Sequence, residues 1–176
     1  LGRYPTGTIR MLFVFALFLT GVWSCEVGVD EAVTEEEVAV YRTVIRPGQG
    51  QDVFVSNGPM TALGITRHSD FGDVLPSLSK ELATDFLARN QEPLNLADDV
   101  IIGEMRLLGA KNREERVADL NQFHSVSRVG FDATAKHALV HYFFFCGALC
   151  GKGAFYLLEK RDGVWVIVSK AETLII

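Results

Sequence analysis

The stretch from Lys136 to Lys170, KHALVHYFFFCGALCGKGAFYLLEKRDGVWVIVSK, decides the fold. Most of its residues are apolar, and many are β-branched or aromatic, which is typical of strands in a covered sheet. A glycine- and cysteine-rich segment interrupts the stretch once, and Asp162-Gly163 interrupts it again. The pattern predicts three consecutive antiparallel strands on which the rest of the chain packs.

The Asp162-Gly163 pair predicts a two-residue hairpin turn, because both residues can take a positive φ and β-rich runs flank them. Such a turn determines which residues face each other. We expect the pairs Arg161–Val164, Lys160–Trp165, Leu158–Ile167 and Leu157–Val168. Large apolar side chains occur on both faces of these strands, so we expect both faces to be covered in part, with two helices on one of them.

The first of these helices is expected to begin after Thr34, which forms a capping box with Glu37 and a hydrophobic staple from Val33 to Val38. Three consecutive glutamates fill its first turn. We interpret them as capping and solvated residues rather than a cation site, because consecutive helical side chains point in different directions.

A second helix is expected from Ser77 to Asn90, with apolar residues four positions apart at Leu78, Leu82 and Phe86. Ser77 and Lys80 match the S-x-x-K pattern of serine acyl enzymes. The sequence has no convincing partner motifs for that chemistry, so we interpret Ser77 as an N-cap and Asn90 as the C-cap.

Less regular segments lie around the second helix. Asp52–Ser56 and Met60–Arg67 predict a pair of strands joined at a turn. Residues 94–110 predict one kinked strand or two short elements, and Arg113–Phe123 predicts a short helix. Together with the meander they predict an α+β fold, with an antiparallel sheet of four to six strands and two or three helices packed against it.

The first 25 residues have the pattern of an export signal. Arg3 and Arg10 precede an apolar run from Met11 to Val22, and no acidic residue occurs before Glu26. The run is shorter than the roughly 20 apolar residues of a membrane span. We therefore expect an export signal over residues 1–25, an acidic tether over 26–33 and a single α+β domain over 34–176.

Val22-Trp23-Ser24-Cys25 resembles a bacterial lipobox. The resemblance implies that Cys25 is lipidated and becomes the mature N-terminus. We expect the protein in the bacterial cell envelope, in the periplasm or on the outer surface, with a lipid anchor in the membrane. The net charge of −5, with basic residues interleaved among glutamates, argues against nucleic acid as a partner.

With a lipid on Cys25, Cys146 and Cys150 remain as an even number of cysteines in an oxidising compartment, which favours a disulfide. Free thiols, a metal pair and a redox centre stay open as alternatives. The C-x-x-x-C spacing without a thioredoxin-like βαβ pattern argues against redox chemistry.

The block from Ser127 to Lys160 resembles a block near the C-terminus of a group of exported bacterial proteins of uncharacterised function. Its core is C-G-x-L-C-G-x-G, from Cys146 to Gly153. The other matching residues are Ser127, Val129-Gly130-Phe131, Ala138-Leu139-Val140, Leu157-Leu158 and Lys160, with Gly163 and Trp165 continuing the block. The resemblance implies export and a shared fold, and it implies no activity or cofactor.

His137 and His141 are four residues apart, which on a helix is the spacing of a metal pair. On a strand the two are roughly 13 Å apart, too far to share one ion. We therefore predict no metal site or cofactor there, and a packed His141. Gly151-Lys152-Gly153 is expected to serve a tight hairpin loop rather than an anion-binding nest.

No complete catalytic constellation is evident, so we predict no catalytic residues. The sequence favours a non-enzymatic binding or interaction module at the envelope, with a protein or small-molecule partner. One alternative is an enzyme with its site on the sheet face, using His141, Tyr142 or an acidic loop residue. The other is a thiol-redox or metal protein that uses Cys146 and Cys150.

Overall fold

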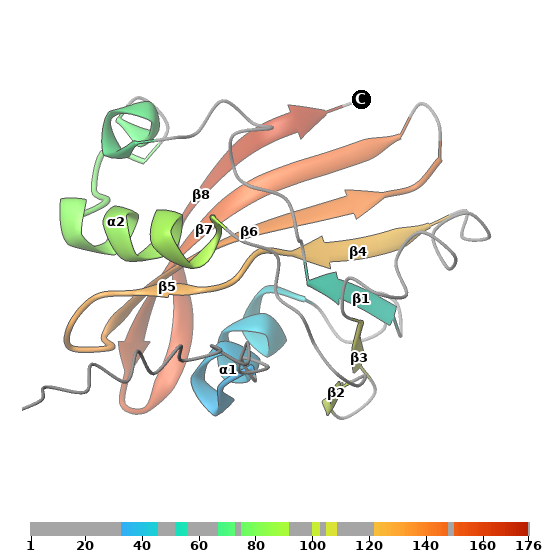
Figure 1. The fold of residues 1–176 in the computed structure, drawn as a ribbon, viewed down its shortest axis with the longest axis horizontal. Helices are drawn as coiled ribbons and strands as arrows, with labels where there is room; N and C mark the ends of the chain where they lie inside the picture. The colour runs from blue at the N-terminus through green and yellow to red at the C-terminus, as the bar shows by residue number, and fades with distance from the viewer. Residues whose placement is uncertain are drawn as a thin grey trace, which may run out of the picture.

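The computed structural model describes residues 33–45, 52–55, 67–72, 75–91, 100–102, 105–108, 122–147 and 150–175. Over these residues the chain has an α+β architecture (Figure 1). The helices are α1 (Glu35–Val44), the 3-10 helix η2 (His68–Phe71) and α2 (Lys80–Arg89). The strands are β1 (Asp52–Val55), β2 (Val100–Ile102), β3 (Met105–Leu108), β4 (Phe123–Val126), β5 (Gly130–Phe131), β6 (His137–Phe145), β7 (Gly151–Arg161) and β8 (Val164–Ile175).

Within the described residues the eight strands form one sheet, in the order β2-β3-β1-β4-β6-β7-β8, with β5 paired to β6. β1 is parallel to both β3 and β4, and the other neighbours are antiparallel. The predicted α+β class is therefore confirmed, but the sheet has eight strands instead of four to six, and it is antiparallel only in part. The reason is that β1 pairs with strands far along the chain, and such parallel pairs leave no turn signal in the sequence.

The three-stranded meander is confirmed as β6, β7 and β8, the long strands that run side by side in Figure 1. Asp162 and Gly163 both have positive φ, at 50° and 81°, as a two-residue hairpin requires. The pairs Arg161–Val164, Lys160–Trp165 and Leu158–Ile167 are confirmed. The predicted fourth pair is wrong: Leu157 faces Ser169 instead of Val168, because a bulge in β8 shifts the register.

The two α-helices cover opposite faces of the sheet, and not one face as predicted. Val40 and Val44 of α1 belong to one core cluster with Val140 and Leu158. The buried residues of α2 share a different cluster with the strand neighbours of those two residues, Leu139 and Leu157. Adjacent residues of a strand point to opposite faces, so each helix has its own face.

The capping box of α1 is confirmed. Thr34 Oγ1 accepts a hydrogen bond from the Glu37 amide at 3.2 Å, and Glu37 Oε2 accepts one from the Thr34 amide at 3.1 Å. The interpretation of the first-turn glutamates as capping and solvated residues is confirmed for the capping role of Glu37, but the Glu37 side chain is buried and Glu36 has partners elsewhere in the fold. Glu36 pairs with Lys160 Nζ at 2.6 Å and accepts from Trp165 Nε1 at 3.1 Å, and these hydrogen bonds lower the pKa of the Glu36 carboxyl.

α2 begins two residues later than predicted. Ser79, not Ser77, is its N-cap, and Ser79 Oγ accepts from the Leu82 amide at 3.2 Å. The predicted C-cap at Asn90 is confirmed. Of the two possibilities for residues 94–110, the described part forms two short antiparallel strands, β2 and β3.

Several predictions lie wholly or largely outside the described residues. They are the export signal over 1–25, the tether over 26–33, lipidation of Cys25, the strand over Met60–Arg67 and the helix over Arg113–Phe123.

Candidate functional site

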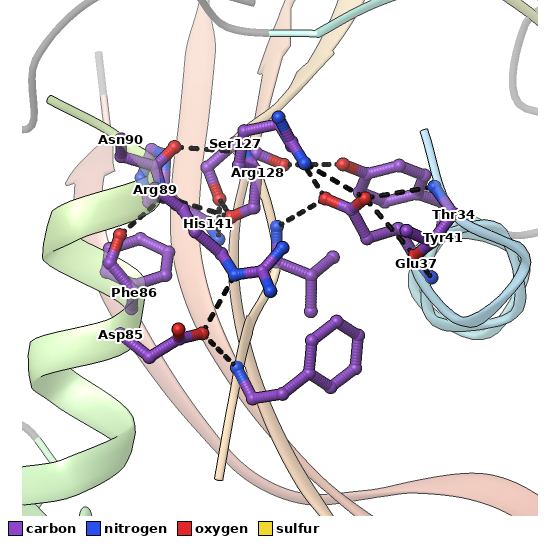
Figure 2. A network of polar contacts seen from close by, with 12 residues as sticks. Thr34, Glu37, Tyr41, Asp85, Phe86, Arg89, Asn90, Ser127, Arg128 and His141 are labelled. Carbon is purple, nitrogen blue, oxygen red and sulfur yellow. Dashed lines mark hydrogen bonds and ion pairs between the residues drawn. The ribbon is translucent and has the colours of Figure 1, made fainter. Parts of the chain in front are cut away.

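The polar centre of the molecule is a buried ion pair between α1 and the segment that joins β4 to β5. Arg128 Nε donates to Glu37 Oε1 at 2.7 Å, and Arg128 Nη2 donates to Glu37 Oε2 at 3.2 Å. The two side chains are 3% and 0% exposed. Glu37 Oε1 also accepts from the Val129 amide at 3.3 Å. The Glu37 carboxylate therefore accepts hydrogen bonds both from the start of its own helix and from the β4–β5 segment, which fixes its position (Figure 2).

The same segment is tied to α2 through Asn90. Its Oδ1 accepts from the Arg128 amide at 2.9 Å, and its Nδ2 donates to the carbonyl oxygens of Phe86 and Arg128 at 2.8 and 3.0 Å. In Figure 2, Arg128 lies between α2 on one side and Glu37 and Tyr41 of α1 on the other. The segment therefore connects the helices of the two sheet faces.

Ser127 completes the network toward β6. Its Oγ donates to the Arg128 carbonyl at 2.9 Å and accepts from the His141 amide at 2.9 Å. Its own carbonyl accepts from the Tyr41 hydroxyl at 2.9 Å. Burial, and next the charge of Glu37, raise the pKa of Tyr41 well above its usual value. These buried groups are satisfied by one another, which suits a structural clamp better than a catalytic centre.

His141 is packed, as predicted, and it lies on the sheet face that α2 covers. Its Nε2 lies 3.1 Å from Thr173 Oγ1, and its ring centroid lies 4.8 Å from that of Phe155. Thr173 occupies the second bulge of β8, and Gly153 leaves room for it, because a Cβ at Gly153 would lie 2.7 Å from Thr173 Oγ1. Gly151 and Gly153 lie in β7, so the prediction that they shape a hairpin loop is wrong.

Stability is expected to fall by about 3 kcal/mol as the pH drops from 6.5 to 4 because of His141 alone. Burial lowers its pKa from 6.5 to about 4. Above pH 6.5 the ring is neutral in both states, whereas between 6.5 and 4 only the unfolded chain gains the proton. Urea unfolding across this range is expected to show a flatter pH dependence for His141→Gln. The half-exposed His137 offers a control, and an unchanged slope in His141→Gln would contradict the assignment.

On the α1 face, His124 and Tyr142 form a second polar pair. His124 Nδ1 lies 2.7 Å from the Tyr142 hydroxyl, and the His124 ring stacks on Phe144 with centroids 4.7 Å apart. Burial lowers the pKa of His124 and raises that of Tyr142 to about 12. Both groups are therefore neutral near pH 7. Among the described residues, neither His124 nor His141 has a recorded side-chain contact with a carboxylate.

Cys146 and Cys150 close the loop between β6 and β7. Their Sγ atoms lie at disulfide-bonding distance, and their Cα atoms are 4.9 Å apart. The Cys146 amide donates to the Cys150 carbonyl at 2.9 Å, and Gly147 has a φ of 123°, which favours glycine. The backbone thus folds back on itself as a bridge over four residues requires.

Removal of this pair by Cys146→Ser with Cys150→Ser is expected to lower the free energy of unfolding by about 2 kcal/mol, since a bridge limits the unfolded chain. Urea unfolding of the full chain with and without reductant measures the same difference. Equal stability of the oxidised, reduced and serine forms would show that no bridge contributes.

A groove of about 790 Å³ runs along the outer side of α2, beside the turn between β5 and β6. It is open to solvent, unlike an enclosed small-molecule site. The residues that line it are Lys80, Glu81, Thr84, Asp85, Ala88, Arg89, Phe131, Asp132 and Ala133. Sequence reasoning missed it, because the exposed face of α2 meets the turn only in the folded chain.

The carboxylates of the groove are occupied by donors within the protein. Asp85 Oδ2 accepts from the Phe131 amide at 2.7 Å and from Arg89 Nε at 2.9 Å. Glu81 Oε1 accepts from the Ala133 amide at 3.2 Å. Burial would raise the pKa of Asp132, but hydrogen bonds from His137 and from nearby backbone and hydroxyl donors lower it to about 2. The acidic side chains therefore shape the groove wall.

The cationic side chains of the groove have fewer hydrogen-bond and ion-pair partners among the described residues than its carboxylates have. The Lys80 ammonium makes no hydrogen bond or ion pair within the described part of the chain, and Arg89 uses only Nε, toward Asp85. The Arg89 guanidinium lies 5.7 Å from the centroid of the Phe131 ring, which holds it over an apolar base. The groups left to meet a ligand are therefore mainly donors.

No cluster of three or more His, Cys, Asp or Glu residues suited to a metal occurs in the described ranges. Within those same ranges, none of the helices has the length and apolar character needed to cross a membrane. No family model, curated protein or solved structure matches the chain.

Proposed function

We propose that this chain is an exported binding module of the bacterial cell envelope, anchored through a lipid on Cys25, and that the groove beside α2 holds a segment of a partner protein. The observation that carries the proposal is the groove itself, which is open and mixed in charge, and in which Lys80 has no hydrogen-bond or ion-pair partner among the described residues and Arg89 pairs only with Asp85 there. Small-molecule sites are mostly enclosed, whereas an open groove of this kind suits a polypeptide.

The spacing of the cations indicates the chemistry of the partner segment. Lys80 and Arg89 begin and end α2. Nine residues of helix separate them by roughly 13 Å along the axis. An extended chain covers that length in roughly four residues. Acidic side chains at least about four residues apart in an extended segment are therefore needed to reach both ends of the groove.

The buried titratable groups support binding over catalysis. Glu37 and Arg128 satisfy each other, His141 contacts Thr173, and His124 contacts Tyr142. An enzymatic site built on His141 or Tyr142 gains no support from these contacts, because each group already has a partner inside the protein.

Site-specific photocrosslinking in intact cells tests the proposal. A photoreactive phenylalanine analogue at Ala88, inside the groove, is expected to form a defined adduct with an envelope protein. The same residue at Gln91, which is exposed but outside the groove, is the matched control. Adducts that form equally well from both positions would contradict the proposal.

Charge reversal makes the test specific. Lys80→Glu is expected to reduce the Ala88 adduct about five- to tenfold, because it replaces attraction by repulsion at one end of the groove. Lys136→Glu reverses another exposed lysine that does not line the groove, and it is expected to leave the adduct unchanged. An adduct that is insensitive to Lys80→Glu would exclude the acidic segment.

A further inference from the structure

The groove beside α2 lies close to the beginning of α1. Trp165 Nε1 donates to Glu36 Oε2 at 3.1 Å, and the Trp165 ring centroid lies 5.9 Å from that of Phe131. Phe131 lines the groove, and its ring centroid lies 5.7 Å from the Arg89 guanidinium. Val33, the first described residue, packs against the same core cluster as Phe131. The chain therefore enters α1 beside the Arg89 end of the groove.

The acidic tether over residues 26–33 has the charge spacing that the groove requires. Glu26 and Asp30 are four residues apart, which spans roughly 13 Å in an extended chain. That length matches the separation of Lys80 and Arg89 along α2. The two carboxylates also lie on one side of an extended chain, because alternate side chains point the same way. The tether contains no basic residue that would repel the two cations.

The chain between the tether and α1 is long enough for this placement. Asp30 lies five residues before Glu35, the first residue of α1, and an extended chain of that length covers roughly 16 Å. The path from Trp165 through Phe131 to Arg89 consists of two steps, of 5.9 and 5.7 Å. Asp30 can therefore reach the Arg89 end of the groove without any change in α1.

Another acidic pair with this spacing is a poorer match. Glu115 and Asp119 are also four residues apart, but Arg113 and Arg116 lie beside them in the sequence. Their guanidinium groups would bring positive charge to the cations of the groove, which is unfavourable. The charge pattern therefore favours the tether as the occupant.

We propose that residues 26–30 dock in the groove of their own chain and that a partner segment must displace them. Asp30 pairs with Arg89, and Glu26 pairs with Lys80 at the other end. The inference rests on the proposed function, because the same two cations receive the acidic side chains of the partner. The tether is thus an internal competitor that limits access to the groove.

A disulfide between the tether and α2 tests the docking in the full chain. Gly28 lies midway between Glu26 and Asp30, and Thr84 lies near the middle of the groove wall. Under mild oxidation, Gly28→Cys with Thr84→Cys is expected to form an internal bridge about tenfold faster than Gly28→Cys with Gln91→Cys, because docking raises the local concentration of the first pair. Equal rates for the two pairs, or bridges only between chains, would overturn the proposal.

Single-charge changes separate docking from simple proximity. Asp30→Asn is expected to slow formation of the bridge to Thr84→Cys about threefold, because it removes the charge that faces Arg89. Glu31→Gln removes the same charge from the opposite side of an extended chain, so it is expected to leave the rate unchanged. Equal effects of the two changes would refute the proposed pairing.

Photocrosslinking from Ala88 distinguishes this inference from the proposed function. In the bridged chain the adduct with an envelope protein is expected to fall about tenfold, and reductant is expected to restore it. The wild-type chain treated with reductant controls for its own disulfide. A partner adduct without the internal bridge, or one undiminished by the bridge, would remove this inference alone. Absence of any partner adduct from the unbridged chain would instead remove the proposed function.

Discussion

Arg128→Met is expected to lower the free energy of unfolding by about 3–5 kcal/mol, because it leaves the Glu37 carboxylate buried without its counter-charge. Glu37→Gln is expected to cost a similar amount, since it removes the buried negative charge that faces the Arg128 guanidinium, although the amide oxygen still accepts from backbone donors. Both side chains are nearly inaccessible to water. Urea unfolding followed by the fluorescence of the buried Trp165 measures each loss.

The double variant Glu37→Gln with Arg128→Met is the control for this prediction. It removes both charges, so its loss is expected to be smaller than the sum of the two single losses by at least about 2 kcal/mol. Purely additive losses would mean that the two side chains act separately and that the pair does not hold α1 to the β4–β5 segment.

Gly130→Ala is expected to destabilise the protein by about 3 kcal/mol or more, through a clash with the backbone of α2. A Cβ at this position would lie 2.5 Å from Phe86 Cβ, 2.6 Å from Phe86 Cα and 2.7 Å from the Phe86 nitrogen. α2 cannot withdraw freely, because Asn90 and Asp85 bind the chain on either side of Gly130. Both thermal unfolding and urea unfolding are expected to show this loss of stability.

Two comparisons separate this clash from a general intolerance of alanine. Gly72→Ala is expected to change stability little, because its φ is an ordinary −54° and its new Cβ would meet only Ser69 O, at 3.3 Å. Truncating Phe86 to alanine is expected not to rescue Gly130→Ala, since the contact involves the backbone and Cβ of residue 86. A neutral Gly130→Ala would show that α2 is not docked as closely as described.

Local features of the fold were predictable from the sequence because their signals are local. The capping box at Thr34 and Glu37 and the Asp162-Gly163 turn each depend on a few adjacent residues, and both are confirmed. The turn also determined the first pairs of β7 and β8. The register failed at Leu157, since nothing adjacent in the sequence marks the bulge that follows.

Features that depend on distant residues were not predictable in this way. The parallel pairing of β1 with β3 and β4 joins segments about 50 to 70 residues apart, as the registers Val53–Leu107 and Val53–His124 show. The same holds for Glu37 with Arg128, which are 91 residues apart. Nothing near Glu37 or Arg128 in the sequence indicates that their side chains pair. Likewise, nothing near Gly130 indicates that it lies against Phe86. Glutamate and arginine side chains are rarely buried in proteins, so the sequence favoured a solvated side chain for Glu37.

The groove could not be predicted from the sequence for a related reason. α2 was expected as an amphipathic helix, and its apolar face at Leu82 and Phe86 is buried as the spacing indicates. Its outer face looks like an ordinary solvated surface. Only the β5–β6 turn, which Glu81 and Asp85 hold against that face, converts it into one wall of a groove.

Intact mass spectrometry of the chain recovered from the membrane fraction of a bacterial host, with and without reductant, tests most directly that this is an anchored envelope module. We expect a chain that begins at a lipid-modified Cys25 and gains two hydrogen atoms on reduction, from a bridge between Cys146 and Cys150. An uncleaved, unmodified chain in the soluble fraction, with no mass change on reduction, would contradict it.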